Sequence, residues 1–143
     1  MSSIEETKEF ALVQAVCGKI KDMVKGGNTI MAPTYMRDFL VGLDVAGELY
    51  SLAVSEDIQA GKALDLAKSI AYFDFAPEYL KAQDVKVSDA AKKTAVSLCP
   101  EVQAAANIKS KTEAMTIFLR NKLQVLRVAH DDIKKIAYTE QTS

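Results

Sequence analysis

The sequence predicts an all-α protein of about five helices, arranged as a helical bundle around a long C-terminal helix. The chain holds only 6 Gly and 3 Pro among 143 residues, a composition that favours helix over a turn-rich β fold. No Gly or Pro follows Glu101, which predicts one uninterrupted helix to the C-terminus. The length of the whole chain, with 49% hydrophobic and 26% charged residues, predicts a single helical domain over residues 1–143.

The first helix is expected to end near residue 25. Ser3 and Glu6 have the spacing of a capping box, in which each side chain satisfies a backbone donor of the first turn. Apolar residues then recur at helical spacing. The segment Gly26-Gly27-Asn28 ends the helix, because glycine readily adopts the left-handed conformation of a C-terminal cap.

A second helix is predicted over residues 33–54, with Pro33 in its first turn. Gly42 and Gly47 each weaken this helix by about 1 kcal/mol relative to Ala. We interpret both glycines as positions of close approach to a neighbour. Ser55-Glu56-Asp57 is interpreted as a break or as the cap of the next helix.

A third helix is predicted over about residues 56–76, where Pro77 kinks or ends it. Many of its inward residues are small, which allows a partner helix to pack closely. Residues 83–87 are expected to form a connector. Ser88 then caps a short fourth helix over about 89–98.

The final helix is expected to start at Pro100 and to extend to about Tyr138. At 100° per residue its apolar residues cover about half of the circumference, which requires more than one neighbouring helix or another subunit. Lys111 and Lys122 fall inside this arc. The residues of the arc are Ile108, Met115, Phe118, Leu119, Leu123, Leu126, Ala129, Ile133 and Ile136.

Charge is distributed unevenly, although the net charge is only −1. Residues 34–84 hold nine acidic and four basic residues, whereas residues 88–143 hold nine basic and six acidic residues. Such asymmetry favours complementation within the fold or between subunits. The alternative is a basic strip that is left for a partner.

The same 100° projection places Lys109, Arg120 and Arg127 in one stripe opposite the apolar arc. A solvated helix face is one interpretation, and contact with a nucleic-acid backbone is the other. Three charges alone bind weakly, so the second interpretation requires an oligomer. Lys122 is interpreted as a snorkelling side chain or a salt-bridge partner of the acidic segment, with phosphate contact as the alternative.

No catalytic, metal or cofactor signature is found, so we expect no enzyme, no catalytic residue, no metal and no cofactor. His130, the only histidine, lacks further residues at metal-ligand or triad spacing. Cys17 and Cys99 do not form a metal or redox motif, and their pairing is left open. The aromatic cluster around Pro77 is interpreted as core packing, with a protein-docking patch as the alternative.

The N-terminus lacks the basic and apolar regions of a signal peptide. The longest apolar runs fall far short of the roughly 20 residues that a membrane-spanning helix needs. We therefore expect no membrane association and a cytoplasmic location, which is the host cytoplasm if the protein is viral.

Three segments carry a family resemblance: Ser88-Asp89-Ala90-Ala91-Lys92-Lys93, Cys99-Pro100-Glu101-Val102 and Asp132-Ile133-Lys134-Lys135-Ile136. Their order and spacing over about 60 residues resemble the small helical recombination mediators of large tailed phages. The resemblance implies a ring-like homo-oligomer that binds single-stranded DNA. It also implies loading of a recombinase onto DNA covered by single-strand-binding protein. The basic residues nominated for DNA contact are Lys92, Lys93, Lys109, Lys111, Arg120, Lys122 and Arg127.

The leading hypothesis is therefore a non-enzymatic accessory factor of phage-type DNA recombination or replication. A second hypothesis is an adaptor or an inhibitor of a host enzyme that uses the acidic surface of residues 34–84 as a nucleic-acid mimic. A third is a structural or assembly protein of a virion.

Overall fold

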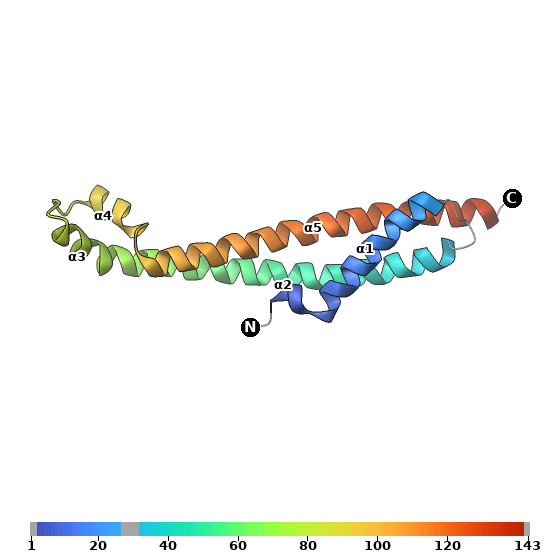
Figure 1. Ribbon diagram of the computed structural model, residues 1–143, viewed down its shortest axis with the longest axis horizontal. Helices are drawn as coiled ribbons and strands as arrows, with labels where there is room; N and C mark the ends of the chain where they lie inside the picture. The colour runs from blue at the N-terminus through green and yellow to red at the C-terminus, as the bar shows by residue number, and fades with distance from the viewer. Residues whose placement is uncertain (1–2, 27–31, 142–143) are drawn as a thin grey trace. The chain divides into compact units, whose positions relative to one another are not determined.

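The computed structural model describes residues 3–26 and 32–141. It confirms an all-α fold of five helices with a long C-terminal helix, and the described residues contain no strand (Figure 1). A short 3₁₀ turn precedes the first helix. The elements in chain order are η1 (Ile4–Glu6), α1 (Lys8–Gly26), α2 (Ala32–Phe73), α3 (Phe75–Ala82), α4 (Asp89–Val96) and α5 (Pro100–Gln141).

The chain divides into two compact units, and each is described by itself. The first unit consists of Met1–Ala53 with Thr116–Ser143, and the second consists of Val54–Met115. Helices α2 and α5 each contribute residues to both units. The sequence pattern alone gives no sign of this division.

The capping box predicted at the first helix is wrong, because a 3₁₀ turn separates Ser3 from α1. The Ser3 hydroxyl accepts a hydrogen bond from the Glu5 amide at 3.3 Å, within that turn. Thr7 caps α1 instead, since its hydroxyl accepts from the Phe10 amide at 3.2 Å. Helix α1 ends at Gly26, close to the predicted end. The rest of the predicted stop, Gly27 and Asn28, lies outside the described residues.

The predicted break at Ser55-Glu56-Asp57 is also wrong, because α2 continues through it as one helix of 42 residues. The Asp57 carboxylate accepts hydrogen bonds from side chains of α5, so it does not serve as a cap. The effect predicted for Pro77 is confirmed, although the helix ends earlier than expected. A proline ring clashes with the carbonyl four residues before it, and that residue, Phe73, is the last of α2.

Helices α3 and α4 pack against each other in the second unit (Figure 1). The predicted connector between them contains Asp84, whose φ of 56° is the only positive value outside glycine among the described residues. The predicted cap at Ser88 is confirmed, since its hydroxyl accepts from the Ala91 amide at 3.1 Å. Helix α5 begins at Pro100, as predicted.

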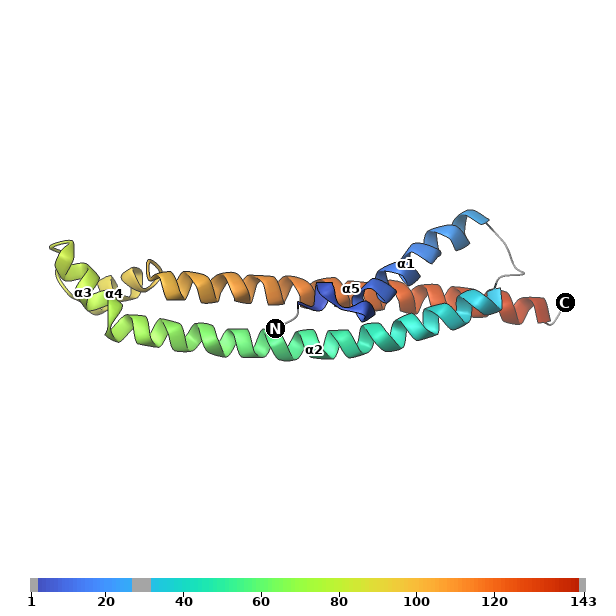
Figure 2. The same ribbon diagram turned by 60° about the horizontal axis from the view of Figure 1, so that its bottom comes forward.

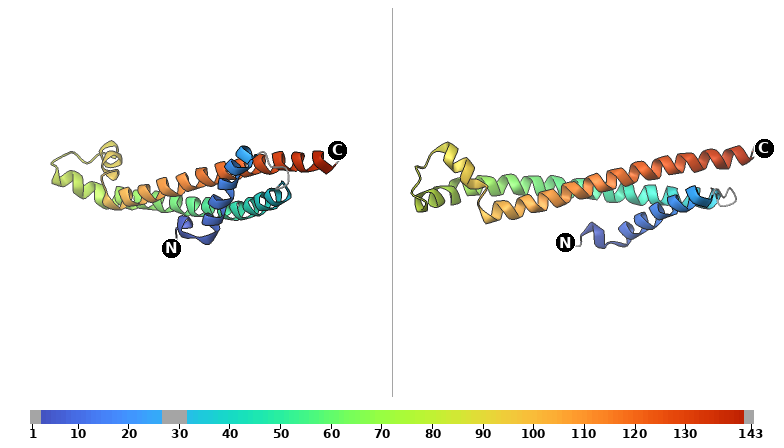
Figure 3. Two further views of the ribbon diagram at one scale, coloured as in Figure 1. Left: turned by 45° about the vertical axis from the view of Figure 1, so that its right-hand side comes forward. Right: turned by 45° about the horizontal axis from the view of Figure 1, so that its top comes forward.

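Large apolar side chains form the core of the first unit. Helix α1 runs alongside α2 and α5 there, as the views in Figures 2 and 3 show. At Gly42 the three helices come together, because a Cβ at this position would lie 2.8 Å from Val16 Cγ1 and 3.5 Å from Leu126 Cδ1. The largest fully buried side chains are Val13, Phe39, Leu119, Leu126 and Ile133.

Smaller side chains dominate the core of the second unit. Tyr72, Phe75 and Tyr79 are partly buried against this core, which supports the core-packing interpretation for three members of the aromatic cluster. Phe73 differs, since 74% of its surface is exposed. The buried residues of this second-unit core are Ala71, Ala76, Leu80, Ala95, Val96, Cys99 and Val102.

Candidate nucleic-acid interface

Lys109 does not lie in an exposed stripe with Arg120 and Arg127. Its ammonium group lies 2.9 Å from Asp57 Oδ1, and the two side chains are only 31% and 21% exposed. The Thr112 hydroxyl donates to the same carboxylate oxygen at 2.8 Å. The hydrogen bonds from Lys109 and Thr112 lower the pKa of Asp57. Lys109 thus belongs to a partly buried polar cluster of the second unit.

The periodicity of α5 explains why the projected stripe differs from the structure. One series of its buried and half-buried positions recurs at alternating steps of three and four residues, the 3.5-residue repeat of supercoiled helices, and further covered positions such as Ala129 lie beside it. In the second unit this series is Val102, Ala105, Lys109 and Thr112, and in the first it is Thr116, Leu119, Leu123, Leu126, His130 and Ile133. A straight helix drifts by about 20° per heptad against such a repeat. The 100° projection therefore moved Lys109 out of the buried series.

A regular line of cations does occur in the first unit. Arg120, Arg127 and Lys134 are exposed and follow one another at intervals of seven residues, so they share one face of α5. We call these three residues the cationic line. Neither arginine forms an ion pair within the described residues, and Lys134 Nζ lies 5.9 Å from the ring centre of Tyr138. Lys134 was not expected to belong to this face, and its seven-residue spacing from Arg127 identifies it.

Lys122 is half-buried in the first unit, and its ammonium group lies 5.2 Å from the ring centre of Phe118. The expected salt bridge to the acidic segment is not formed within the described part of the chain. Burial raises the pKa of the neighbouring Cys17 thiol, and the positive charge of Lys122 partly opposes this rise. These contacts favour a packing role for Lys122 over phosphate contact.

Lys92 and Lys93 lie in the second unit, in the middle of α4. Lys93 forms an ion pair with Asp89 at 3.2 Å, and Lys92 Nζ lies 4.6 Å from the ring centre of Tyr72. The Tyr72 hydroxyl donates to Asp89. This hydrogen bond, with a smaller contribution from Lys93, lowers the pKa of Asp89. Lys111 is exposed in the same unit.

The seven nominated residues therefore divide between the two units. Arg120 and Arg127 lie together on one exposed face in the first unit. Lys122 is in that unit but packs inward. Lys92, Lys93, Lys109 and Lys111 lie in the second unit, where three of the four have a charged or aromatic partner.

The two glycines of α2 have opposite surroundings. Gly42 is packed against α1 and α5, whereas nothing within 4 Å would meet a Cβ at Gly47. Gly47 lies in a groove of about 660 Å³ whose walls include the exposed side chains of Leu40 and Val41. The predicted close approach is thus found within the chain at Gly42 but not at Gly47.

Other site types find little support in the described residues. No group of three or more His, Cys, Asp and Glu side chains there could hold a metal ion. None of the described helices combines the length and apolar character that crossing a membrane requires. Cys17 and Cys99 are free thiols. His130 is mostly buried, with Nδ1 3.9 Å from Asp131.

Comparison of the chain with protein-family models, with curated proteins and with solved structures finds no match.

Proposed function

We propose that this protein is a non-enzymatic accessory factor of phage-type DNA recombination or replication that binds single-stranded DNA. The observation that carries the proposal is the cationic line of Arg120, Arg127 and Lys134. Seven helical residues span about 10.5 Å, so the line offers repeated positive charges along one helix face to a sugar–phosphate backbone. Phosphate contacts of this kind require no sequence-specific readout.

Self-association is the second part of the proposal. Three cations in one copy bind a nucleic acid weakly, but several copies multiply the phosphate contacts. Apolar side chains left exposed in the first unit support an interface between copies. They include Leu40 and Val41 on α2, and Ile117, Val125 and Val128 on α5.

In this role the oligomer would hold single-stranded DNA and assist a recombinase in replacing single-strand-binding protein. The resemblance of residues 88–102 and 132–136 to recombination mediators supports this assignment of partners. The chain itself supplies binding surfaces rather than a reaction centre.

A fluorescence-anisotropy titration with a labelled oligonucleotide tests the proposal. We expect salt-sensitive binding, with a weaker salt dependence in the Arg120→Glu/Arg127→Glu variant. The matched control is Lys21→Glu/Lys62→Glu, which makes the same change of net charge at two exposed lysines on other helices. Absence of salt-sensitive binding at micromolar protein, or equal loss in both variants, would refute the proposal.

Native mass spectrometry with and without the oligonucleotide tests the oligomer separately. We expect several copies per particle. A protein that stays monomeric and does not bind the oligonucleotide contradicts the proposal, whereas large assemblies that form without DNA favour the virion assembly hypothesis.

The acidic adaptor remains a second candidate because Asp44 and Glu48 are exposed on α2. Two other acids of that segment are neutralised within the chain, Asp38 by Lys19 at 2.9 Å and Asp57 by Lys109. Charge reversal at Asp44 and Glu48 is therefore the informative change. Capture of a host enzyme that these reversals abolish, without any DNA binding, would favour the adaptor.

A further inference from the structure

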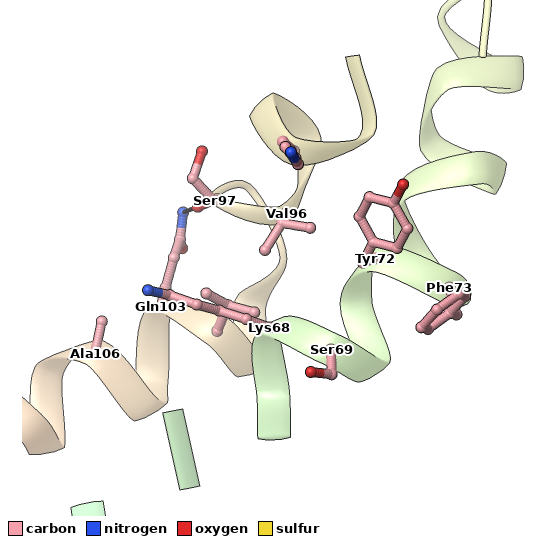
Figure 4. Close-up of a pocket in the computed structure, with 10 residues that line it drawn as sticks. Lys68, Ser69, Tyr72, Phe73, Val96, Ser97, Gln103 and Ala106 are labelled. Atoms are coloured by element: carbon pink, nitrogen blue, oxygen red, sulfur yellow. Dashed lines mark hydrogen bonds between the residues drawn. The ribbon is translucent and has the colours of Figure 1, made fainter. Parts of the chain in front are cut away.

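The second unit contains a groove of about 620 Å³ in which three helices meet (Figure 4). Side chains of α2, α4 and α5 form its walls, and Val96 and Val102 are buried at its base. Volumes of this size hold several side chains or a small ligand. The lining residues are Lys68, Ser69, Tyr72, Phe73, Lys93, Val96, Ser97, Val102, Gln103 and Ala106.

Most polar groups of the groove already have partners within the protein. The hydroxyls of Ser69 and Ser97 donate to the carbonyls of Asp65 and Thr94, at 3.1 and 2.8 Å. The Gln103 side-chain amide donates to the Ser97 carbonyl at 3.3 Å. These bonds stabilise the walls and use both hydroxyl donors, whereas the hydroxyl oxygens and the Gln103 amide oxygen can still accept hydrogen bonds.

The charged groups of the lining are both positive. Lys68 is exposed and forms no ion pair within the described residues, and Lys93 is paired only with the solvent-exposed Asp89. An exposed pair of this kind contributes little free energy, so Lys93 can exchange partners. No acidic residue belongs to the lining itself. The groove thus presents an apolar base beside two ammonium groups.

The aromatic edge of the groove favours a protein partner. Phe73 is 74% exposed on α2, next to Tyr72, which forms part of the same wall. Exposed aromatic residues beside a concave apolar surface are typical anchors of protein interfaces. This wall is held in place by the hydrogen bond from Tyr72 to Asp89 and by the cation–π contact of Lys92 with the Tyr72 ring.

We propose that this groove binds an acidic peptide segment of a partner protein, in which carboxylates flank a bulky apolar side chain. The apolar side chain contacts Val96, Val102 and the ring of Phe73. The carboxylates pair with Lys68 and Lys93. The site lies wholly in the second unit and does not involve the cationic line, so it stands or fails independently of DNA binding.

The probe for the test is a short fluorescein-labelled peptide of glutamate, leucine and phenylalanine. Its matched controls carry lysine in place of each glutamate, or alanine in place of each phenylalanine. Fluorescence anisotropy should show at least about tenfold tighter binding of the probe than of either control peptide. Amide resonances of Ser69, Ser97 and Gln103 should shift on titration, which locates the peptide in the groove.

Two protein variants test the geometry. Lys68→Glu removes the unpaired cation, and Ala106→Phe fills the groove from α5, so each should weaken probe binding by about tenfold or more. Lys62→Glu makes the same charge change on α2 outside the lining and should leave binding unchanged. Circular dichroism and thermal melting verify that each variant folds.

Three outcomes would overturn the proposal: no probe binding to the folded wild-type protein at millimolar peptide, equal binding of the lysine-containing control, or shifts confined to residues outside the groove. DNA binding by the same sample would be unaffected in each case. Failure here is therefore distinguishable from failure of the proposed function.

Discussion

The two units of this protein pack the same two long helices by different means. In the first unit, α2 and α5 contribute large apolar side chains such as Phe39, Leu119 and Leu126, all fully buried. In the second unit, the corresponding surfaces carry alanines and the polar cluster of Asp57, Lys109 and Thr112. Both units nevertheless keep the 3.5-residue repeat along α5.

This difference separates two requirements of a helical bundle. Burial of large apolar groups contributes most of the free energy of folding. A polar pair within an apolar seam contributes little net free energy but selects one alignment of the helices, because other alignments leave a charge without its partner. We infer that the first unit supplies stability, whereas the Asp57–Lys109 pair defines the register of the second unit.

The largest effect is expected from a cavity in the first unit. Leu126→Ala removes a side chain with 0% exposure, and such changes cost about 2–5 kcal/mol of the free energy of unfolding. Urea denaturation measures the change. Leu66→Ala is the matched control, because Leu66 is exposed and its replacement should cost less than about 0.5 kcal/mol. Similar losses in the two variants would contradict the expectation that burial of Leu126 stabilises the first unit.

A smaller effect is expected when the polar pair of the second unit is broken. Asp57→Ala leaves the half-buried Lys109 without its carboxylate, which should cost about 1–3 kcal/mol. Replacing both residues with leucine should recover most of this loss, because two apolar side chains can pack in the interface between α2 and α5 without a charge being left unpaired. Equilibrium unfolding of the single and double variants measures the coupling. If the double variant is as unstable as Asp57→Ala, the pair contributes more than register.

The glycines of α2 provide a third test, because alanine should destabilise the protein at one of them and stabilise it at the other. Gly42→Ala forces a Cβ to within 2.8 Å of Val16 Cγ1, and overpacking of this kind costs about 1–3 kcal/mol. Gly47→Ala meets no atom within 4 Å and should stabilise the helix by about 0.5–1 kcal/mol. Thermal melting compares the two, with Val16→Ala as the change that should rescue Gly42→Ala. Stabilisation by both substitutions would show that Gly42 is not a tight contact.

Much of the fold could be predicted because local signals agreed with it. The absence of Gly and Pro after Glu101 predicted α5, and Pro77 and Ser88 marked the end of α2 and the start of α4. The break at Ser55-Glu56-Asp57 failed because residues that favour a cap in isolation are also accepted inside a helix when a partner side chain satisfies them. That partner, Lys109, is 52 positions away in the sequence.

The candidate site could be predicted only in part. Arg120 and Arg127 were correctly placed on one exposed face because they are seven residues apart. Lys109 was misplaced and Lys134 was overlooked, since a projection at 100° per residue accumulates error along a helix that follows a 3.5-residue repeat. The groove at Tyr72 and Val96 could not be predicted, because it depends on how α4 packs against α2.

The smallest effect is a loss of stability in acid, and it should be larger in the second unit than in the first. The carboxyl groups of Asp57, Asp89 and Glu101 all lie in this unit, and side-chain hydrogen bonds from Lys109, Tyr72 and Cys99 respectively lower their pKa values. A carboxyl whose pKa is lower in the folded state stabilises the fold above its unfolded pKa of about 4. This contribution is lost as the pH falls through the folded-state pKa.

Hydrogen exchange of individual amides at decreasing pH tests this expectation. After correction for the intrinsic rate, protection should fall first at Ala60 and Ala106, while Phe39 and Leu126 remain protected. Asp57→Asn removes one titrating group and should flatten the pH dependence in the second unit alone. Asp44→Asn is the matched control, because Asp44 is exposed in the first unit and forms no ion pair within the described residues. Simultaneous loss of protection in both units would mean that the two units unfold cooperatively. The contributions of the Asp57–Lys109 pair and of the apolar core to stability could then not be measured separately.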